Sequence, residues 1–199
     1  TGMFELDGKI IVITGGAGFL GEKYAEAIAQ FGGIPILLDL DIDRIEVVTS
    51  KIKTMYSVDS LGIAVDITNE QEVNVAVSKI FKKFHKIDGL INNAAINPKV
   101  DLDKESNFSR LENFPIESWS QEVNVGLTGA FLSSKIMGPI IAKNPSGGSI
   151  INISSDLGLI APNQSLYSID GLSPDQQPVK PITYSVIKSG LIGLSRYLS

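Results

Sequence analysis

Five short apolar runs recur along the chain, each bounded by polar, charged or glycine residues. They are rich in isoleucine, leucine and valine and are too short for helices, which favours buried β-strands. The runs cover residues 9–14, 34–38, 61–65, 87–91 and 149–153. Segments with helical periodicity lie at residues 22–31, from 68 or 69 to 84, at 119–143 and from Tyr184 onward. This alternation predicts an α/β fold, a Rossmann-type doubly wound parallel sheet between two layers of helices.

Composition narrows the class of protein. The chain has 199 residues, of which 43% are hydrophobic, and a net charge of −5. The acidic balance argues against nucleic acids and anionic membranes as partners. No apolar run reaches about 18 residues and no signal peptide is found, so we expect no membrane contact and a cytoplasmic location. With no cysteine and a single histidine, His85 in a polar helix end, we expect no metal site and no thiolate chemistry.

The first predicted strand runs into a glycine-rich turn that opens the next helix. Small residues in such a turn let the backbone approach a pyrophosphate, and the helix N-terminus offers free N–H groups. A plain glycine-rich connection without a ligand is the alternative. The residues expected to contact the cofactor are Gly15, Gly18, Phe19, Leu20 and Gly21.

Acidic residues close the second and third predicted strands. Asp39 lies 18 residues past Gly21, close to the spacing of about 20 expected for a carboxylate that binds the adenosine ribose. No Arg or Lys stands immediately beside Asp39 in sequence, so NAD is favoured over NADP. Alternatively, Asp39 only caps the next helix, which Asp41 or Asp43 could do equally well.

Two further segments are expected at the cofactor. Asp66, followed by Ile67, is predicted to hydrogen-bond the adenine amino group, unless it serves only as a helix cap. The fourth strand ends in Asn92 and then Asn93, Ala94 and Ala95, whose small and amide side chains suit close approach by a cofactor ring.

Tyr184 and Lys188 stand four residues apart at the start of the last predicted helix, so both side chains leave the same face. A fixed ammonium beside a phenol favours the phenolate, which suits proton transfer to or from a hydroxyl or carbonyl. A surface i,i+4 pair is the alternative. Ser155 follows the fifth strand, and Asn124 lies inside the long helix, where a buried amide needs hydrogen-bond partners. Because the carboxyl ends of parallel strands meet at one edge, we expect these groups and the glycine turn to converge there.

Taken together, these residues resemble the short-chain dehydrogenase/reductase family over about residues 9–199. The matching positions are Thr14, Gly15, Gly18 and Gly21, Asp66, Asn92 to Ala95, Asn124, Ser155, Tyr184 and Lys188. The resemblance implies that Tyr184 is the general acid/base and that Ser155 hydrogen-bonds the reacting oxygen. It also implies that Lys188 binds the nicotinamide ribose and that Asn124 positions a water in the proton relay.

Three features depart from the family pattern. The glycine spacing, with Phe19 where the commonest branch has glycine, resembles the branch that acts on nucleotide sugars. Tyr184 follows Ser155 by 29 residues, where about a dozen is usual, so segment 159–183 is expected to be an inserted loop that walls the substrate pocket. The family's last strands are missing after Ser199, so the expectation is a single NAD(P)-binding domain, residues 1–199, from an incomplete chain.

The favoured function is an NAD-dependent oxidoreductase acting by a Ser-Tyr-Lys mechanism on a polar, sugar-derived alcohol or ketone. The inserted loop and the glycine spacing resemble reductases of bacterial surface-sugar or flagellin-glycan synthesis. Two alternatives stay open: a nucleotide-sugar epimerase or dehydratase with retained NAD, and a non-catalytic dinucleotide sensor or scaffold. A homodimer or homotetramer is expected, because the long helix 119–143 is apolar on most faces.

Overall fold

The computed structural model describes residues 4–96 and 109–199, which divide into two compact units. The first unit comprises residues 1–94 and 128–153, and the second comprises residues 95–127 and 154–199. The glycine turn and the predicted adenosine-binding residues belong to the first unit. Asn124, Ser155, Tyr184 and Lys188 all belong to the second.

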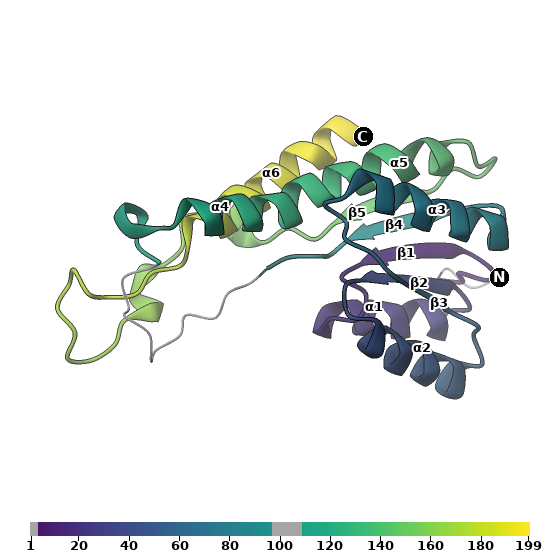
Figure 1. Cartoon of the computed structure of the whole chain (residues 1–199), viewed down its shortest axis with the longest axis horizontal. Coiled ribbons are helices and arrows are strands. Elements are labelled where there is room, and N and C mark those ends of the chain that lie inside the picture. Colours follow the sequence, from purple (N-terminus) through teal and green to yellow (C-terminus); the bar gives the residue numbers. More distant parts are fainter. Residues whose placement is uncertain (1–3, 97–108) are drawn as a thin grey trace. The chain divides into compact units, whose positions relative to one another are not determined.

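A parallel five-stranded sheet forms the centre of the first unit, which confirms the predicted fold class (Figure 1). The strands are β1 Ile10–Thr14, β2 Ile34–Asp39, β3 Leu61–Ala64, β4 Gly89–Asn92 and β5 Ser149–Asn152. Their order is β3-β2-β1-β4-β5, so β1 lies in the middle and pairs with both β2 and β4. All four pairings are parallel, as the βαβ alternation requires.

Helices cover both faces of this sheet. Helices α1 (Phe19–Gln30) and α2 (Ile42–Tyr56) lie on one face, and α3 (Glu70–Phe84) and α5 (Gly129–Ala142) lie on the other (Figure 1). Successive strand residues point to opposite faces, so Val12 and Ile13 of β1 enter two separate buried clusters. Helix α2 begins at an N-cap, Asp41, whose side chain accepts from Arg44 N. Asp39 therefore does not cap this helix.

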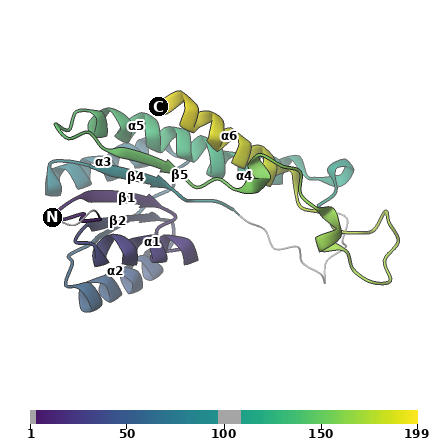
Figure 2. The same ribbon diagram turned by 180° about the vertical axis from the view of Figure 1, so that it is seen from behind.

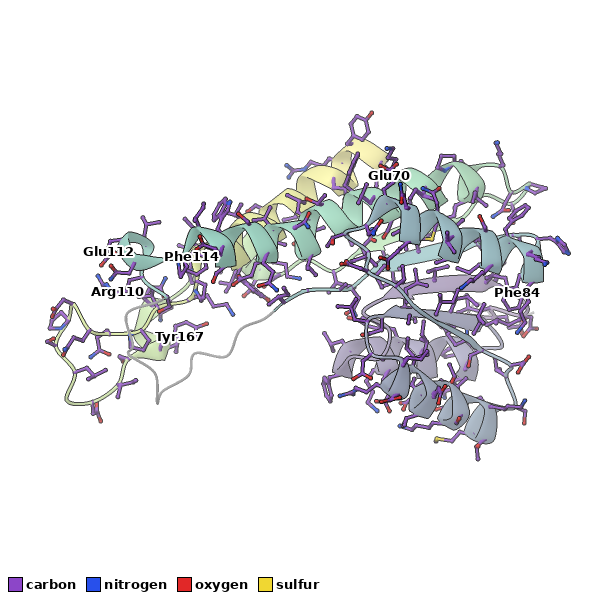
Figure 3. All side chains as sticks on the ribbon, in the orientation of Figure 1. Glu70, Phe84, Arg110, Glu112, Phe114 and Tyr167 are labelled. Carbon is purple, nitrogen blue, oxygen red and sulfur yellow. The ribbon has the colours of Figure 1, made fainter. Side chains whose placement is uncertain are left out.

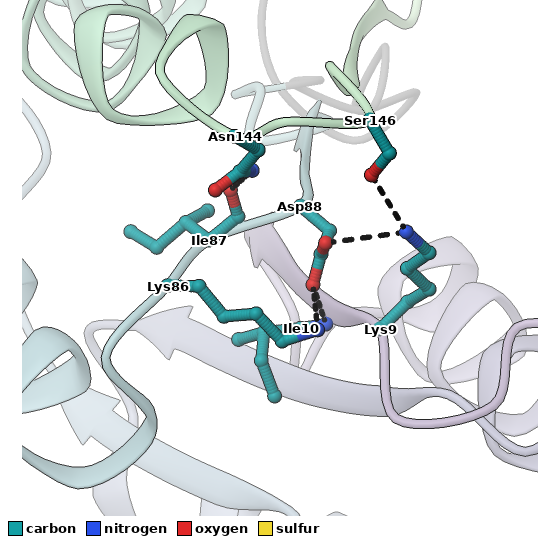
Figure 4. Close-up of polar contacts among 7 residues, drawn as sticks. All are labelled: Lys9, Ile10, Lys86, Ile87, Asp88, Asn144 and Ser146. Atoms are coloured by element: carbon teal, nitrogen blue, oxygen red, sulfur yellow. Dashed lines mark hydrogen bonds and ion pairs between the residues drawn. The ribbon is translucent and has the colours of Figure 1, made fainter.

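The Asp88 carboxylate holds the beginning of β4 to the beginning of β1 (Figure 4). Its Oδ2 accepts a hydrogen bond from Ile10 N at 2.8 Å and lies 2.9 Å from Lys86 Nζ, while Oδ1 lies 3.4 Å from Lys9 Nζ. Burial opposes ionisation of this carboxyl, but the Ile10 hydrogen bond and the Lys86 and Lys9 ammoniums outweigh it and lower the pKa of Asp88. Asp88 is thus a structural anion at the end of the sheet opposite the glycine turn.

In the second unit, helices α4 (Ile116–Val123) and α6 (Ile182–Leu198) lie side by side (Figure 2). A π-helical segment, η2 (Asn124–Thr128), follows α4 directly. Close packing on α6 depends on glycine here: a Cβ at Gly126 would lie 2.7 Å from Ile187 Cγ2, and one at Gly190 would lie 2.9 Å from Leu127 Cδ2. The two small residues let the backbones of η2 and α6 approach each other.

The α4, η2 and α5 segments form one continuous helix, Ile116–Ala142, of 27 residues. In the described part of the chain it is the one helix long and apolar enough to cross a membrane, judged by length and composition alone. That is weak evidence, since 44% of the apolar window is buried within the fold and a core helix passes the same test. Ser133 and Ser134 in this helix are buried polar residues, which suits a core position.

The inserted segment 159–183, expected to be a loop without secondary structure, contains a short helix. It contains a 3₁₀ helix, η4 (Gln164–Tyr167), and another short helix, η3 (Asp156–Gly158), precedes it. Gln177 closes a compact turn: its Oε1 accepts from Ile169 N at 2.8 Å, and its Nε2 donates to Leu172 O at 2.8 Å. Arg110, labelled in Figure 3 beside its ion-pair partner Glu112, donates to Pro174 O at 3.2 Å.

The polar stretch 96–117 shows no strong periodicity in sequence, so no regular structure is expected in it. Its residues 97–108 lie outside the described residues. Its end differs from the expectation, since a 3₁₀ helix, η1 (Leu111–Asn113), forms there and α4 begins at Ile116 rather than at Trp119.

Candidate functional site

The glycine turn after β1 is shaped by close backbone contacts within the first unit. Gly15 has φ +62, in the left-handed region, and a Cβ there would lie 2.9 Å from Ala94 Cα. A Cβ at Gly21 would lie 2.1 Å from Gly15 O, so any side chain at this position would disrupt the turn. Gly18 is the N-cap of α1 and makes no side-chain capping bond. Phe19 and Leu20, the first residues of α1, are exposed.

The Thr14 hydroxyl joins the glycine turn to the segment that follows β4. It accepts hydrogen bonds from Asn93 N and Ala94 N, both at 3.1 Å. Asn93 completes the link, because its Nδ2 donates to Thr14 O and Gly15 O at 3.0 Å. The sequence included Thr14 in the motif but gave no sign of this role. Asn93 and Ala94 thus lie against the glycine turn, at the edge where the carboxyl ends of β1 and β4 meet.

Asp39 lies at the end of β2, in contact with the same turn. Its Oδ2 accepts from Ala17 N at 3.0 Å, and its Oδ1 accepts from Leu40 N at 2.8 Å. Arg44 of α2 donates from Nε to Ala17 O at 3.1 Å. The fold therefore brings a cation, Arg44, into contact with the glycine turn, although no Arg or Lys stands immediately beside Asp39 in sequence.

The other predicted adenosine-side residues have structural partners. Asp66 Oδ1 accepts from Thr68 N at 2.8 Å and from Thr68 Oγ1 at 2.7 Å, while the N-cap of α3 is Asn69. Asp66 therefore forms a turn before α3 and is not its cap. The Ile67 side chain is buried in a core cluster, so only its backbone could contact a ligand. Ala95 belongs to the second unit and is exposed.

Ser155 is held next to Lys188 by two contacts with α6, one from Ser154 and one from Gly158 of η3. Ser154 Oγ donates to Lys188 O at 2.8 Å, and a Cβ at Gly158 would lie 2.8 Å from Lys188 C. Ser155 itself is the N-cap of η3, where its Oγ accepts from Leu157 N at 3.2 Å. The same hydroxyl donates to Asp156 Oδ1 at 2.7 Å.

Asn124 differs from the prediction, because its side chain is exposed rather than buried. It is the first residue of the π segment η2. Gly126, two residues after Asn124, is buried and faces α6. Residues two apart on a helix do not share a face, so Asn124 points away from α6. The amide is therefore open to water, and π segments of this kind occur often at functional sites.

Tyr184 and Lys188 lie in the first turns of α6. Lys188 is only 7% exposed, which rules out the alternative of a solvent-exposed surface pair. Its Nζ is 5.6 Å from the centroid of the Tyr184 ring. Burial lowers the pKa of Lys188, and repulsion by the nearby Lys180 ammonium lowers it further.

Three residues around Tyr184 were missed from the sequence. Lys180 Nζ lies 3.9 Å from the Tyr184 ring centroid. The buried Glu122 of α4 accepts a short hydrogen bond from the hydroxyl of Thr183, which precedes Tyr184 and is itself buried. The available signal was Glu122, the one acid in the helix predicted over residues 119–143. Lys180 lies four residues before Tyr184, but it precedes α6, so a helical spacing did not apply to it.

The structure thus forms two groups of predicted site residues. Within the first unit, the glycine turn, Asp39, Asn93 and Ala94 are joined by hydrogen bonds. Within the second, the elements that carry the four predicted catalytic residues pack together. A single site built from both groups stays a prediction. Among residues 4–96 and 109–199, no group of three His, Cys, Asp or Glu side chains could hold a metal ion.

Comparison with curated proteins gives relatives that are longer than this chain. It is 28% identical over 194 residues to the post-translational flagellin modification protein A of Campylobacter coli, covering 98% of this chain and 71% of that protein. It is 34% identical over 197 residues to the short chain dehydrogenase/reductase dpfgG of Gibberella zeae, covering 96% and 63%.

Solved structures show the same fold. The match to NAD⁺-bound xylitol dehydrogenase covers 96% of this chain and 64% of the xylitol dehydrogenase chain, with TM-score 0.79 and 23% identity. The match to NADPH-dependent 3-quinuclidinone reductase from Rhodotorula rubra covers 98% of this chain and 65% of the reductase chain, with TM-score 0.76 and 24% identity. The sequence model of the family described as short chain dehydrogenase matches residues 9–169 of this chain. On the extent of that match and the likeness to the Gibberella protein, this chain belongs to the short-chain dehydrogenase family.

Proposed function

We propose that this chain carries the cofactor-binding and catalytic parts of an NAD-dependent oxidoreductase that interconverts a polar alcohol and its ketone. The observation that carries the proposal is the packing within the second unit. Ser154 and Gly158 hold the turn with Ser155 on Lys188 of α6, and Gly126 packs η2, which begins at Asn124, on the same helix. Membership of the short-chain dehydrogenase family supports the reaction class.

The glycine turn suits the diphosphate of a nicotinamide dinucleotide. A Cβ at Gly18 would meet only Gly15 O, at 3.3 Å, so the backbone there is open to a ligand. The N-cap of α1 makes no side-chain bond, which leaves the first N–H groups of the helix available for an anion. Asp39, hydrogen-bonded to the same turn, would accept from free ribose hydroxyls and repel a 2′-phosphate. NAD is therefore preferred, although Arg44 also contacts the turn and makes the preference worth measuring.

The nicotinamide ring supplies the hydride acceptor or donor when it is bound. During oxidation, the Tyr184 phenolate takes the proton of the substrate hydroxyl, and during reduction the phenol returns it to the carbonyl oxygen. Lys188 favours the phenolate through its positive charge and binds the nicotinamide ribose. The open amide of Asn124 positions a water through which the proton exchanges with solvent.

Ser155 stabilises charge on the reacting oxygen. A serine hydroxyl has one proton, and here that proton is donated to Asp156. Ser155 must therefore rotate away from Asp156 before it can donate to a substrate. The motion needs only a change of the side-chain rotamer at the start of η3.

The substrate class we favour is a sugar-derived polyol or its ketone. The inserted segment contributes polar side chains, and one relative is named as a flagellin modification protein and one structural neighbour as a xylitol dehydrogenase. A homodimer or homotetramer and a cytoplasmic location stay predictions. The glycine spacing favours a second candidate, a nucleotide-sugar epimerase or dehydratase that retains NAD.

The test compares the full-length protein with its Tyr184→Phe variant in assays of NAD reduction with a panel of sugar alcohols, including xylitol. Loss of the phenol should lower turnover by about 10²–10⁴-fold, the range typical of a lost general acid/base. Cofactor affinity should barely change. Tyr197→Phe is the matched control, because Tyr197 lies on the same helix and is 87% exposed.

Near-full activity of Tyr184→Phe would refute the assignment. Conversion of a nucleotide sugar without net NAD reduction, with cofactor retained through purification, would favour the epimerase or dehydratase. NAD binding without turnover of any alcohol or sugar would favour the sensor or scaffold.

A further inference from the structure

We propose that Glu122 of α4 is a positioning residue of the tyrosine site, which fixes Tyr184 relative to Asn124 through its hydrogen bond with Thr183. The proposal rests on the function proposed above and adds to it a residue outside the Ser-Tyr-Lys set. All of these residues belong to the second unit.

The Glu122 carboxylate is buried at a place where an apolar side chain would serve packing equally well. Glu122 is 5% exposed, and its Oε2 accepts a hydrogen bond from the hydroxyl of Thr183, which is fully buried. Taking a carboxylate out of water costs free energy that only hydrogen bonds or opposite charges offset. A hydrogen bond also requires a particular distance and direction, whereas apolar contacts allow two helices to slide. The acid therefore adds geometric precision to the contact between α4 and α6.

The hydrogen bond joins the two helices next to two of the predicted catalytic residues. Glu122 stands two residues before Asn124, and Thr183 stands one residue before Tyr184. The π segment η2 begins at Asn124, so Glu122 anchors the helix just before its hydrogen-bond pattern changes. Neighbouring residues of a helix are held at a fixed rise and rotation. One bond between Glu122 and Thr183 therefore sets the spacing between the backbones that carry the amide and the phenol.

Glu122 also acts on the ring of Tyr184, through Lys180. Lys180 Nζ lies 3.9 Å from the centroid of the Tyr184 ring, within the range of about 6 Å for a cation–π contact. Burial lowers the pKa of Lys180, and attraction by the Glu122 carboxylate opposes that shift. The backbone of Lys180 is held as well, since its N–H donates to Gln164 Oε1 at 2.8 Å. Glu122 thus binds the residue before Tyr184 and attracts the ammonium that packs on its ring.

The test uses the full-length protein and whichever sugar alcohol of the panel is turned over. Glu122→Met and Thr183→Val each remove the hydrogen bond, while Glu122→Gln keeps an acceptor and Thr183→Ser keeps the donor. The Met and Val variants should lower kcat by about 10–100-fold, since a misplacement of roughly 1 Å can cost about 100-fold. KM and NAD affinity should change little, and the Gln and Ser variants should restore most of kcat. Glu117→Met, which removes an exposed acid from the first turn of α4, is the matched control.

The double variant Glu122→Met/Thr183→Val separates positioning from stability. Replacing both partners with apolar groups can leave the free energy of unfolding nearly unchanged. A purely structural role would let kcat recover together with stability, whereas a positioning role keeps kcat as low as in Glu122→Met. Recovery of kcat in the double variant would overturn the proposal, and so would an unchanged kcat in Glu122→Met or an equal loss in Glu117→Met.

A second readout needs no substrate and is independent of the proposed function. ¹³C labels in the rings of the 5 tyrosines give a Tyr184 signal, identified by its loss in Tyr184→Phe. The signal should shift in Glu122→Met, return most of the way in Glu122→Gln and stay in place in Glu117→Met. An unshifted signal in Glu122→Met would overturn the proposal.

The two failures can be told apart. If no sugar alcohol is turned over, or if Tyr184→Phe stays active, the proposed function fails, while the ring signal still decides whether Glu122 positions Tyr184. If Glu122→Met does not fold, as judged by circular dichroism, Thr183→Val takes its place, with Thr183→Ser as the variant that restores the signal.

Discussion

The Asp39 carboxylate joins the end of β2 to the glycine turn and is also the predicted partner of the adenosine ribose. Replacing it with Asn keeps an oxygen acceptor for Ala17 N but removes the charge that repels a 2′-phosphate. We expect NAD to bind more tightly than NADP to the unmutated protein, and Asp39→Asn to narrow that difference about tenfold or more, the scale of one hydrogen bond to a charged group. Asp39→Ala should narrow it as well and also loosen the turn.

Titration of both cofactors by calorimetry checks this prediction. Asp43→Asn, an exposed acid in the first turn of α2, is the control and should leave the ratio unchanged. Equal affinity of the unmutated protein for NAD and NADP would contradict the ribose role and would point to Arg44 as a ligand for the 2′-phosphate.

Asp88, at the end of the sheet opposite the glycine turn, supplies a pH-dependent contribution to the free energy of unfolding. Its folded-state pKa is lowered, so the stabilisation is present above the ordinary carboxyl pKa of about 3.9 and is lost as pH falls through the lower folded value. Asp88→Asn should therefore lower the free energy of unfolding by about 1–2 kcal/mol at neutral pH. The difference between the two proteins should shrink below about pH 4. Urea unfolding at neutral and acidic pH measures both, and a deficit that persists unchanged in acid would argue against the ionic explanation.

The residues that sequence identified best are those whose neighbours lie close in the chain. Lys188 is buried four residues after Tyr184, and Gly21 is required by its contact with Gly15 in the same turn. Thr14 and Glu122 act through partners brought near by folding, so no local spacing marked them. Lys180 lies four residues before Tyr184, but it stands outside α6. Asn124 was predicted to be buried because its neighbours are apolar, but the helix turns that position towards solvent.

At the scale of elements, strand predictions agreed with the structure to within two residues, because each strand is a compact apolar run. The long helix was harder to interpret. Its π segment adds a residue to one turn, so the apolar stripe of α4 does not continue in phase into α5.

The inserted segment is folded on itself and anchored to α6 at Lys180, which suits a wall of the substrate site better than a loose tether. Replacing residues 163–178 with a short Gly-Ser link should raise KM or abolish turnover, because polar groups that select the substrate are removed. NAD affinity should stay nearly unchanged. Steady-state kinetics with whichever sugar alcohol of the panel is turned over, together with NAD titration, provide the measurement. An intact kcat/KM would show that the segment does not contribute to the site.

The whole molecule is expected to form a homodimer or homotetramer. Large apolar side chains remain exposed on elements of the second unit, which favours an interaction surface. They include Leu111, Ile116, Leu159, Ile160, Leu166 and Val186. Light scattering of the full-length protein at micromolar concentration should give a dimer or tetramer, and Ile116→Arg should reduce the assembled fraction. A monomeric unmutated protein would refute the prediction.

The central position of β1 also has a consequence for folding during synthesis. This strand is made first, yet Ile11 pairs with Gly89, and the Thr14 hydroxyl receives its donors from Asn93 and Ala94. The ribosome must therefore release most of the first unit before the middle of the sheet can close, and β5 arrives later still. Pairings between such distant residues fold slowly and leave apolar strands without partners in the meantime. The order β3-β2-β1-β4-β5 thus sets the interval in which the nascent chain exposes strands that have no partner.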